Sequence, residues 1–285
     1  MQALLDTVAA HDGTAPLDEQ RWRRMRDGGG DGFHAVMLRD AGGRLVAYAQ
    51  IERTGQAWSL AVAADPGEPP ALAEHLAAEI RAVLGPVGPA ELWVSQPRPL
   101  HERVAAALGL LAERSLYQMR RPLPVQETFD LPTRAFVPGQ DEAAWLEVNN
   151  RAFAWHPEQG GWDLAELARH EALPWFDPEG FRVYERDGRM AGFCWTKVHA
   201  DGTPPMGEIY VIATDPDFAG AGLGRLLTLA GLDHLAGVGL RTGMLYVDAD
   251  NIRAVKLYIG MGFVVHHVDT TFSGVLGFSG VLGPA

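Results

Sequence analysis

The sequence contains one cysteine, Cys194, among its 285 residues. A single thiol excludes an intramolecular disulfide and any metal site built from several cysteines, and it favours a reducing, cytoplasmic location. Basic residues are also scarce, because 24 Lys and Arg stand against 36 Asp and Glu, for a formal net charge of −12. A molecule of this charge repels nucleic acid and anionic membranes, apart from any local basic patch. We therefore expect neither as a partner.

Long apolar runs and targeting signals are missing as well. No stretch of 18 apolar residues occurs, and the first residues, MQALLDTVAAHDG, lack a basic region followed by an apolar core and a cleavage site. We expect no membrane span and no signal peptide. The ten histidines show no ligand spacing, since His266 and His267 are adjacent on an expected strand and face opposite ways. We predict that the protein holds no metal.

What the sequence does contain is an internal repeat of about half its length. The stretches FHAVMLRDAGGRLVAYAQIE and FRVYERDGRMAGFCWTKVH both read as strand, tight turn, strand. Each is followed by an apolar strand that ends in Asp-Pro, then a helix, a strand, a second helix and a last strand. Asp65 and Asp215 lie 150 positions apart, and Gly109 and Gly262 lie 153 apart. The order of elements predicts a mixed α/β fold in two tandem copies, each a mostly antiparallel mixed sheet flanked by helices.

The boundaries of the copies follow from composition. The stretch RRPLPVQETFDLPT holds three prolines and few apolar runs, which is typical of a linker. We expect an N-terminal domain over residues 1–122, a linker over 123–134 and a C-terminal domain over 135–272. The hexamer FSGVLG occurs twice over residues 272–283, and the C-terminus is glycine-rich, so we expect a flexible tail over residues 273–285.

A glycine cluster follows the Asp-Pro turn of the second copy, in VIATDPDFAGAGLGRLLTLAGL. A helix that begins at Gly222-Leu223-Gly224 presents unpaired N–H groups and the positive end of its dipole, which suits an anion. Glycines also let the backbone approach a phosphate closely. A bare G-x-G before a helix is equally compatible with a tight turn.

The cluster resembles the acyl-CoA-binding motif of the GNAT superfamily of N-acyltransferases. The fit covers residues 219–224, with Ala219 where Gln or Arg is usual and Ala221 where a basic residue is common. The resemblance implies that pantetheine pairs with the strand and that pyrophosphate rests on the helix amides, with acetyl-CoA bound more weakly than usual. The cofactor-binding residues it implies are Ile212, Ala213, Thr214, Ala219, Gly220, Ala221, Gly222, Leu223, Gly224, Arg225, Asn251 and Lys256.

The resemblance also implies catalytic roles for two residues. Glu208 begins the strand before the glycine cluster and takes the place of the base that deprotonates the amine. Tyr258 lies seven residues after Asn251, a helix N-cap, and takes the place of the acid that protonates the CoA thiolate. Cys194 is expected to be a core residue and not a nucleophile. Strict strand alternation places Glu208, Tyr210 and Ile212 on one face and Ile209, Val211 and Ala213 on the other.

The first copy lacks this chemistry. Trp58, Arg98 and Ala105 stand where the second copy has Glu208, Asn251 and Tyr258, and GEPPALAE replaces DFAGAGLG. We expect the first copy to support the second and to form one wall of the substrate cleft.

The whole chain resembles the mycothiol synthase family, the tandem GNAT proteins of actinobacteria. The resemblance is carried mainly by FAWHPEQGGWD, WTKVH and LYVDADNIRAVKLYIGMGF. It implies direct acetyl transfer from acetyl-CoA to the cysteine amine of cysteinyl-glucosamine-inositol, by a monomer. Two alternatives stay open: acetylation of another small amine, such as an aminoglycoside or an amino acid, and a non-catalytic CoA-binding protein. The substrate-binding residues implied are Glu19, Glu158, Lys197, Glu208 and Tyr246.

Overall fold

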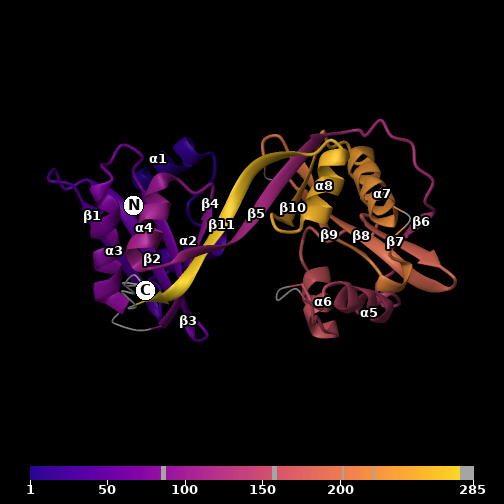
Figure 1. The fold of residues 1–285 in the computed structure, drawn as a ribbon, viewed down its shortest axis with the longest axis horizontal. Coiled ribbons are helices and arrows are strands. Elements are labelled where there is room, and N and C mark those ends of the chain that lie inside the picture. Colours follow the sequence, from indigo (N-terminus) through magenta and orange to yellow (C-terminus); the bar gives the residue numbers. More distant parts are fainter. Residues whose placement is uncertain (85–87, 156–158, 201, 221, 277–285) are drawn as a thin grey trace, which may run out of the picture. The chain divides into compact units, whose positions relative to one another are not determined.

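The computed structural model describes residues 1–84, 88–155, 159–200, 202–220 and 222–276, with only the backbone described at residues 19 and 20. The chain divides into two compact units (Figure 1). Unit 1 comprises Met1–Tyr117, Asp248–Asp250 and His267–Ala285, and unit 2 comprises Gln118–Val247 and Asn251–His266.

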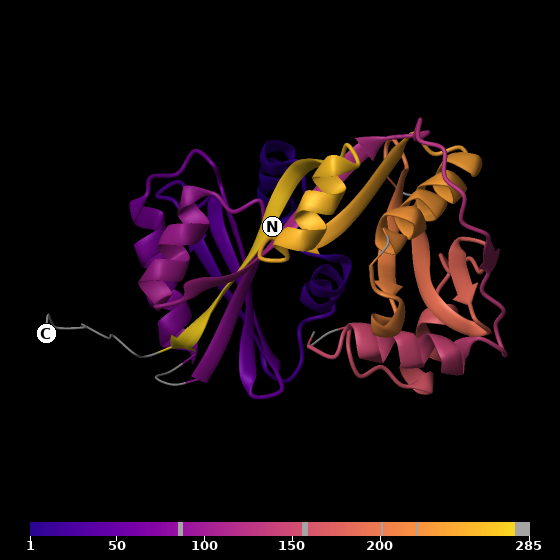
Figure 2. The same ribbon diagram turned by 45° about the vertical axis from the view of Figure 1, so that its right-hand side comes forward.

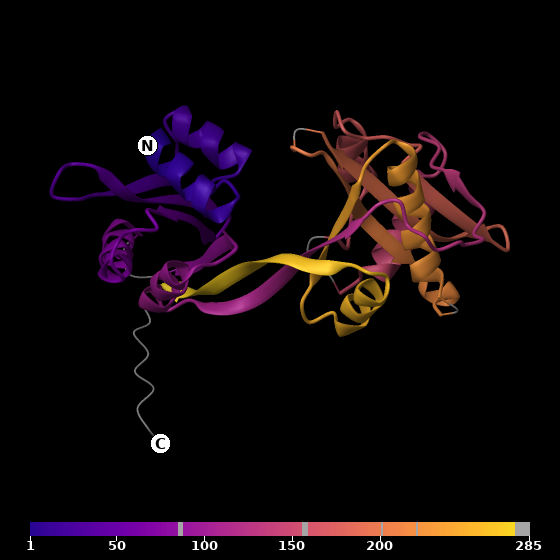
Figure 3. The same ribbon diagram turned by 90° about the horizontal axis from the view of Figure 1, so that it is seen from above.

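In unit 1 the sheet order is β1-β2-β3-β4-β11-β5. Strands β1, β2 and β3 pair antiparallel, β3 pairs parallel with β4, and β4 pairs antiparallel with β11. Figure 3 shows α1 and α2 on one face of these strands and α3 and α4 on the other. Both faces are apolar and buried under helices. The elements are α1 (Gln2–Asp12), α2 (Glu19–Arg26), β1 (Phe33–Arg39), β2 (Leu45–Thr54), β3 (Ala57–Ala64), α3 (Ala71–Leu84), β4 (Gly88–Ser95), α4 (Pro99–Leu108) and β5 (Leu111–Pro122).

In unit 2 the sheet order is β5-β10-β9-β8-β7-β6. Strands β6 to β9 pair antiparallel, and β9 pairs parallel with β10. Helices α5 and α6 cover one face and α7 the other (Figure 2). The elements are β6 (Thr133–Ala135), α5 (Glu142–Ala152), α6 (Leu164–Glu171), β7 (Phe181–Arg186), β8 (Arg189–His199), β9 (Met206–Thr214), the 3₁₀ turn η1 (Pro216–Phe218), α7 (Leu223–Gly237), β10 (Thr242–Asp248), α8 (Ile252–Gly260) and β11 (Val264–Leu276).

The mixed α/β fold and its two similar copies are confirmed. The β7–β8 hairpin turns at Asp187 and Gly188, which both have positive φ angles of 54° and 73°. This conformation matches the twist of a two-residue hairpin and is one that Asp-Gly readily adopts. The local chemistry of the turn therefore explains why the sequence predicted it.

The core of unit 2 is aromatic on the α5–α6 side of the sheet. Trp145 of α5 and Trp195 of β8 are fully buried, and the ring of Trp195 stacks on Phe181 with centroids 4.6 Å apart. On the opposite face, a Cβ at Gly231 of α7 would lie 2.4 Å from the Sγ of Cys194. The absence of a side chain at Gly231 therefore allows α7 to approach β8 closely.

Two long strands pass from one unit to the other. From His267 onward β11 belongs to unit 1, where Asp269 to Leu276 pair with Ser95 to Gly88 of β4, and β5 enters unit 2 at Gln118. The compact units thus divide the chain differently from the predicted domains. The predicted tail also begins too early, because residues 273–276 are held by antiparallel pairing with β4. Residues 277–285 lie outside the described part of the chain.

Candidate active site

Strands β9 and β10 pair only at their beginnings. Their register runs from Gly243–Gly207 to Leu245–Ile209, whereas β9 continues to Thr214 and β10 to Asp248. Over the described residues 210–214, β9 therefore pairs with β8 alone. The backbone groups on its β10 side, including those of the predicted cofactor residues Ile212 to Thr214, are available to an extended ligand.

A β-bulge at Tyr210 interrupts the alternation of the β9 side chains between the two faces of the sheet. Trp195 of β8 pairs with Val211, but the next residue, Thr196, pairs with Ile209, so Tyr210 is the extra residue. The prediction that Ile209, Val211 and Ala213 share one face is wrong. Val211 and Ala213 pack with the aromatic cluster of unit 2, which also contacts Tyr210, while Ile209 lies against α7.

The glycine cluster forms an open turn at the start of α7. Gly220 and Gly222 have positive φ angles of 108° and 76°, and Gly222 is the N-cap of α7. A Cβ at either position would meet nothing within 4 Å. The space on the Cβ side of both glycines is therefore open, which fits the close approach of a pyrophosphate to the backbone. Ala221 lies outside the described residues.

The turn is held in place by charged groups on its flank. The carboxylate of Asp215, which directly follows β9, is 1% exposed and accepts from Arg151 Nη1 of α5 at 2.8 Å and from the N–H of Asp217 at 2.8 Å. On the other side, Arg225 Nη2 donates to Glu127 Oε1 at 3.2 Å, and Arg121 lies 3.5 Å from the same carboxylate. Arg225 therefore supplies a cation near the first turn of α7, but a carboxylate already partners it.

Glu208 lies near the beginning of β9 and is buried, with 7% of its surface exposed. Its Oε2 is 2.6 Å from Nε2 of His199, which lies on the neighbouring strand β8. The cross-strand partner of Glu208 is Lys197. The ammonium of Lys197 lies over two aromatic rings, 4.8 Å from the centre of Trp175 and 5.4 Å from that of Tyr210. A carboxylate, an imidazole and an ammonium thus converge at one end of the β8–β9 pair.

Tyr258 is buried on α8, and its ring contacts Phe263 edge to face with centroids 5.7 Å apart. Burial raises the pKa of Tyr258 well above its usual value, with a smaller contribution from Cys194, so the phenol keeps its proton. Cys194 is fully buried, and burial raises the pKa of its thiol to about 12, which confirms the prediction of an inert core residue. The Oδ1 of Asn251 accepts from the N–H of Ala254 at 3.1 Å, which confirms the predicted N-cap.

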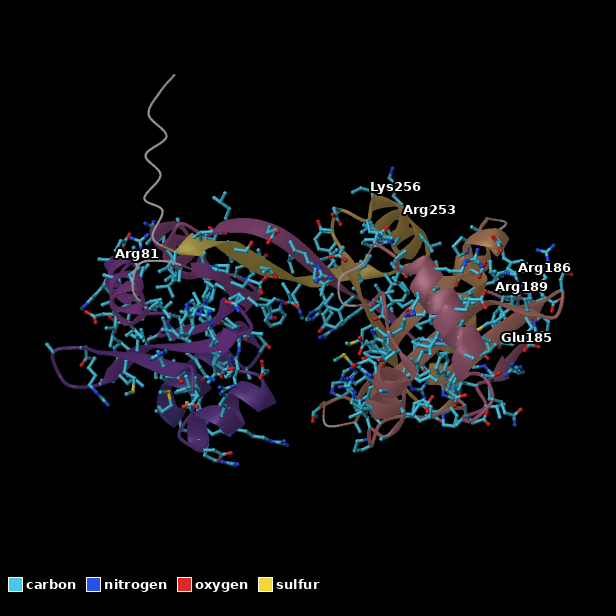
Figure 4. All side chains as sticks on the ribbon, turned by 90° about the horizontal axis from the view of Figure 1, so that it is seen from below. Arg81, Glu185, Arg186, Arg189, Arg253 and Lys256 are labelled. Atoms are coloured by element: carbon cyan, nitrogen blue, oxygen red, sulfur yellow. The ribbon has the colours of Figure 1, made fainter. Side chains whose placement is uncertain are left out.

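Of four other predicted residues, two are exposed at the surface and two are not fully described. Tyr246 is 39% exposed on β10, and its hydroxyl accepts from Gln118 Nε2 at 2.7 Å. Lys256 is exposed and projects outward from α8, near Arg253 (Figure 4). Glu158 lies outside the described residues. Glu19 begins α2 in unit 1, and its side chain is likewise not described.

Three side chains around the site were not predicted from the sequence: His199, Trp175 and Glu127. His199 has a signal in the sequence, because alternation along β8 places it on the same face as Lys197. The other two have none, since Trp175 and Glu127 come from irregular segments whose positions depend on tertiary packing.

The equivalent region of unit 1 is filled by its own side chains. Strands β3 and β4 also pair over only three positions, from Trp58–Ala90 to Leu60–Leu92. Arg98 Nη2 donates to the carbonyl of Ala64 at 3.0 Å, and buried His101 hydrogen-bonds to the backbone of Val62. By the 150-residue offset, Val62 and Ala64 match Ile212 and Thr214. Backbone that is available in unit 2 is therefore already occupied in unit 1.

No group of three or more His, Cys, Asp or Glu side chains in the described part of the chain could hold a metal ion. Among the same residues, no helix is long and apolar enough to span a membrane.

Known proteins are similar to this chain over nearly all of its length. The acetyltransferase (GNAT) family matches residues 143–263. A mycothiol acetyltransferase of Acidimicrobium ferrooxidans is 43% identical over 280 residues, which cover 94% of this chain and 90% of the relative. A mycothiol acetyltransferase of Streptomyces coelicolor is also 43% identical, over 95% of this chain and 89% of the relative.

Solved structures share the fold at lower identity. A GCN5-related N-acetyltransferase from Sphaerobacter thermophilus has a TM-score of 0.73 and 22% identity, covering 96% of this chain and 90% of its own. A tandem GNAT protein from the clavulanic acid biosynthesis pathway has a TM-score of 0.57 and 18% identity, covering 99% and 94%. These two structures support the tandem fold alone.

Proposed function

The chain belongs to the mycothiol acetyltransferases of the GNAT family, which are N-acetyltransferases that use acetyl-CoA, and on that premise we propose its substrate and its catalytic residues. The acceptor is the cysteine amine of cysteinyl-glucosamine-inositol, and the product is mycothiol. The observation that carries the proposal is the position of Glu208. This buried carboxylate lies just before the point where β9 separates from β10, on the strand that leads to the glycine turn.

The groups that bind the cofactor belong mostly to the backbone. The free edge of β9 at Ile212 to Thr214 pairs with the pantetheine amides, and the amides from Gly220 to Arg225 receive the pyrophosphate. Open space above Gly220 and Gly222 supports this placement. Acetyl-CoA, when bound, supplies the acetyl group as a thioester.

Glu208 acts as the base. The acceptor amine arrives as an ammonium, and the carboxylate of Glu208 removes a proton so that the nitrogen lone pair can attack the thioester carbonyl. Backbone N–H groups near Ile212 donate to the oxygen on which negative charge develops.

Tyr258 acts as the acid. Its phenol keeps its proton and donates it to the departing sulfur, and the second proton that the nitrogen loses as the amide forms restores the phenol. Glu208 shares the α5–α6 side of the sheet with Tyr210 and Lys197. Transfer to the amine is direct and requires no covalent enzyme intermediate.

A polar cavity beside α6 suits an acceptor rich in hydroxyl groups. This cavity of about 450 Å³ is lined by Trp162, Glu166, Arg169 and His170, together with Gly161 and Asp163. The His170 ring lies 6.5 Å from that of Tyr210, two residues beyond Glu208 on the same strand. An aromatic ring beside several charged hydrogen-bonding groups suits a sugar or an inositol.

The acceptor is tested by steady-state kinetics with acetyl-CoA and a panel of amines. We expect kcat/KM for cysteinyl-glucosamine-inositol to exceed that for free cysteine and for an aminoglycoside by about 100-fold or more, because the sugar hydroxyls contribute binding energy in the transition state. A better acceptor elsewhere in the panel would mean that the enzyme acetylates another small amine. Absence of turnover with every amine would favour the non-catalytic, CoA-binding alternative.

A further inference from the structure

We propose that His199 is a positioning residue for Glu208: its Nε2–H donates to Oε2 of the carboxylate and leaves Oε1 free to take the proton of the acceptor. The inference rests on the proposed role of Glu208 as the base. It adds a residue to the reaction that neither the glycine motif nor the Asn251–Tyr258 pair contains.

The geometry that supports this role comes from the pairing of β8 and β9. Lys197 pairs with Glu208 and His199 pairs with Met206, so His199 is the diagonal neighbour of Glu208 on the same face. Its Nε2 reaches Oε2 at 2.6 Å. The side chain of Glu208 is 9% exposed, whereas that of His199 is 33% exposed. The imidazole thus covers one oxygen of a nearly buried carboxylate and remains in contact with solvent.

The chemistry of the pair decides which atom carries the proton. A base must be an ionised carboxylate, which only accepts hydrogen bonds, so Nε2 of His199 has to be the donor. A hydrogen bond to the ionised form favours that form. In the proton transfer, an N–H bond of the ammonium breaks and an O–H bond forms at Oε1, while the His199 bond to Oε2 is kept.

Other charged and titratable groups face the pair and belong to the same environment. Lys197 lies opposite Glu208 on β8, and Tyr210 follows it on β9. Glu166 and His170 of α6 also approach Tyr210, and both Glu208 and Glu166 contribute to a raised pKa of Tyr210, although burial is the larger cause. Among the described residues, the side chain that hydrogen-bonds to the carboxylate of Glu208 is His199, so His199 is the partner that can orient it.

The test compares His199→Phe with His199→Gln, which retains an N–H donor. We expect the Phe variant to lose about 10- to 100-fold in kcat/KM, with unchanged acetyl-CoA affinity by calorimetry, and the Gln variant to recover most of the loss. The acidic limb of the kcat/KM profile should move to higher pH in the Phe variant only. His75→Phe, an exposed change on α3, is the control.

A double-variant cycle separates this inference from the proposed function. In a Glu208→Gln background, His199→Phe should cost little more, because the carboxylate it positions is gone. Equal losses in both backgrounds, or a loss in the Phe variant with no movement of the pH profile, would overturn the role of His199. Full activity of Glu208→Gln alone would instead remove the base on which the inference rests.

Discussion

The ion pair of Arg225 with Glu127 is the contact from which we predict an effect on cofactor affinity. The family motif usually has side-chain donors or cations at the positions of Ala219 and Ala221, so Arg225 is the first cation after the glycine turn. Its guanidinium is already paired with Glu127. A carboxylate near a pyrophosphate site lowers the local positive potential and opposes binding of the anionic cofactor.

Replacing that carboxylate tests this reasoning. Glu127→Gln keeps a hydrogen-bond acceptor for Arg225 but removes the negative charge, so the Kd for acetyl-CoA should fall by roughly threefold at low salt. The gain should shrink as ionic strength rises. Calorimetric titration measures both, with Glu79→Gln on α3 as a control for net charge. Unchanged or weaker affinity, in a variant with wild-type thermal stability, would contradict our placement of the pyrophosphate.

At the scale of single elements, strand β9 combines a bulge, a free edge and a terminal carboxylate. The bulge at Tyr210 places Glu208, Tyr210 and Val211 on the α5–α6 side, and the pairing with β10 ends next to it. In unit 1 the corresponding opening, where β3 and β4 no longer pair, is occupied by residues at the start of α4. The N-cap of this helix, Arg98, and its residue His101 hydrogen-bond to the backbone of β3 and so occupy the opening.

The closure of unit 1 by His101 predicts a dependence of stability on pH. Burial lowers the pKa of His101 to about 4, below the value of 6.5 expected in the unfolded chain. Between these values the unfolded state binds more protons, so stability from this group is present above pH 6.5 and is lost as pH falls to 4. The loss is on the order of 3 kcal/mol. Urea unfolding of wild type and His101→Gln at pH 7, 5.5 and 4 measures it.

The two proteins in that experiment share their carboxylates, so only the difference between them reports on His101. The wild type should lose more unfolding free energy than the variant as pH falls. Parallel pH dependences would show that the imidazole is not buried in its neutral form, and that the opening of unit 1 is not closed by it.

The sequence patterns predicted the helices and strands better than they predicted the contacts between residues that are distant in the chain. Periodicity and turn chemistry predicted the hairpins, the helix starts at Asn251 and Gly222, and the position of Glu208, because those features depend on neighbours in the chain. The bulge at Tyr210 was missed, since an extra residue leaves the composition of a strand unchanged. The partners Glu127 and Trp175 were missed because they meet Arg225 and Lys197 only after folding.

For the whole molecule, the main result is that the two copies differ in function although they share a fold. Apart from β6 and the turn η1 of the second copy, both copies have the same order of helices and strands, and in both the pairing of the two parallel strands stops after three positions. The first copy has Trp58 in place of the base, with Arg53 5.0 Å above its ring. Strands β5 and β11 each have residues in both units. Local sequence patterns cannot predict this, because they predict that a segment is a strand but not which unit it joins.

This difference between the copies predicts one acetyl-CoA per chain. Unit 2 offers free β9 backbone and the glycine turn, whereas in unit 1 the matching backbone is occupied by Arg98 and His101 and the glycines are replaced by GEPPALAE. Calorimetric titration should therefore give a stoichiometry of one, abolished by Gly222→Glu. A second molecule bound per chain, or binding that survives Gly222→Glu, would contradict the assignment of the site to unit 2 alone.

We propose that unit 2 acetylates cysteinyl-glucosamine-inositol with Glu208 as the base. The most direct measurement is kcat of Glu208→Gln with this acceptor, taken together with the acetyl-CoA Kd of the same protein. Loss of the base should lower kcat by about 100-fold or more and leave Kd unchanged, because the cofactor is held by backbone further along β9 and at the start of α7. A variant that turns over at the wild-type rate would contradict the account.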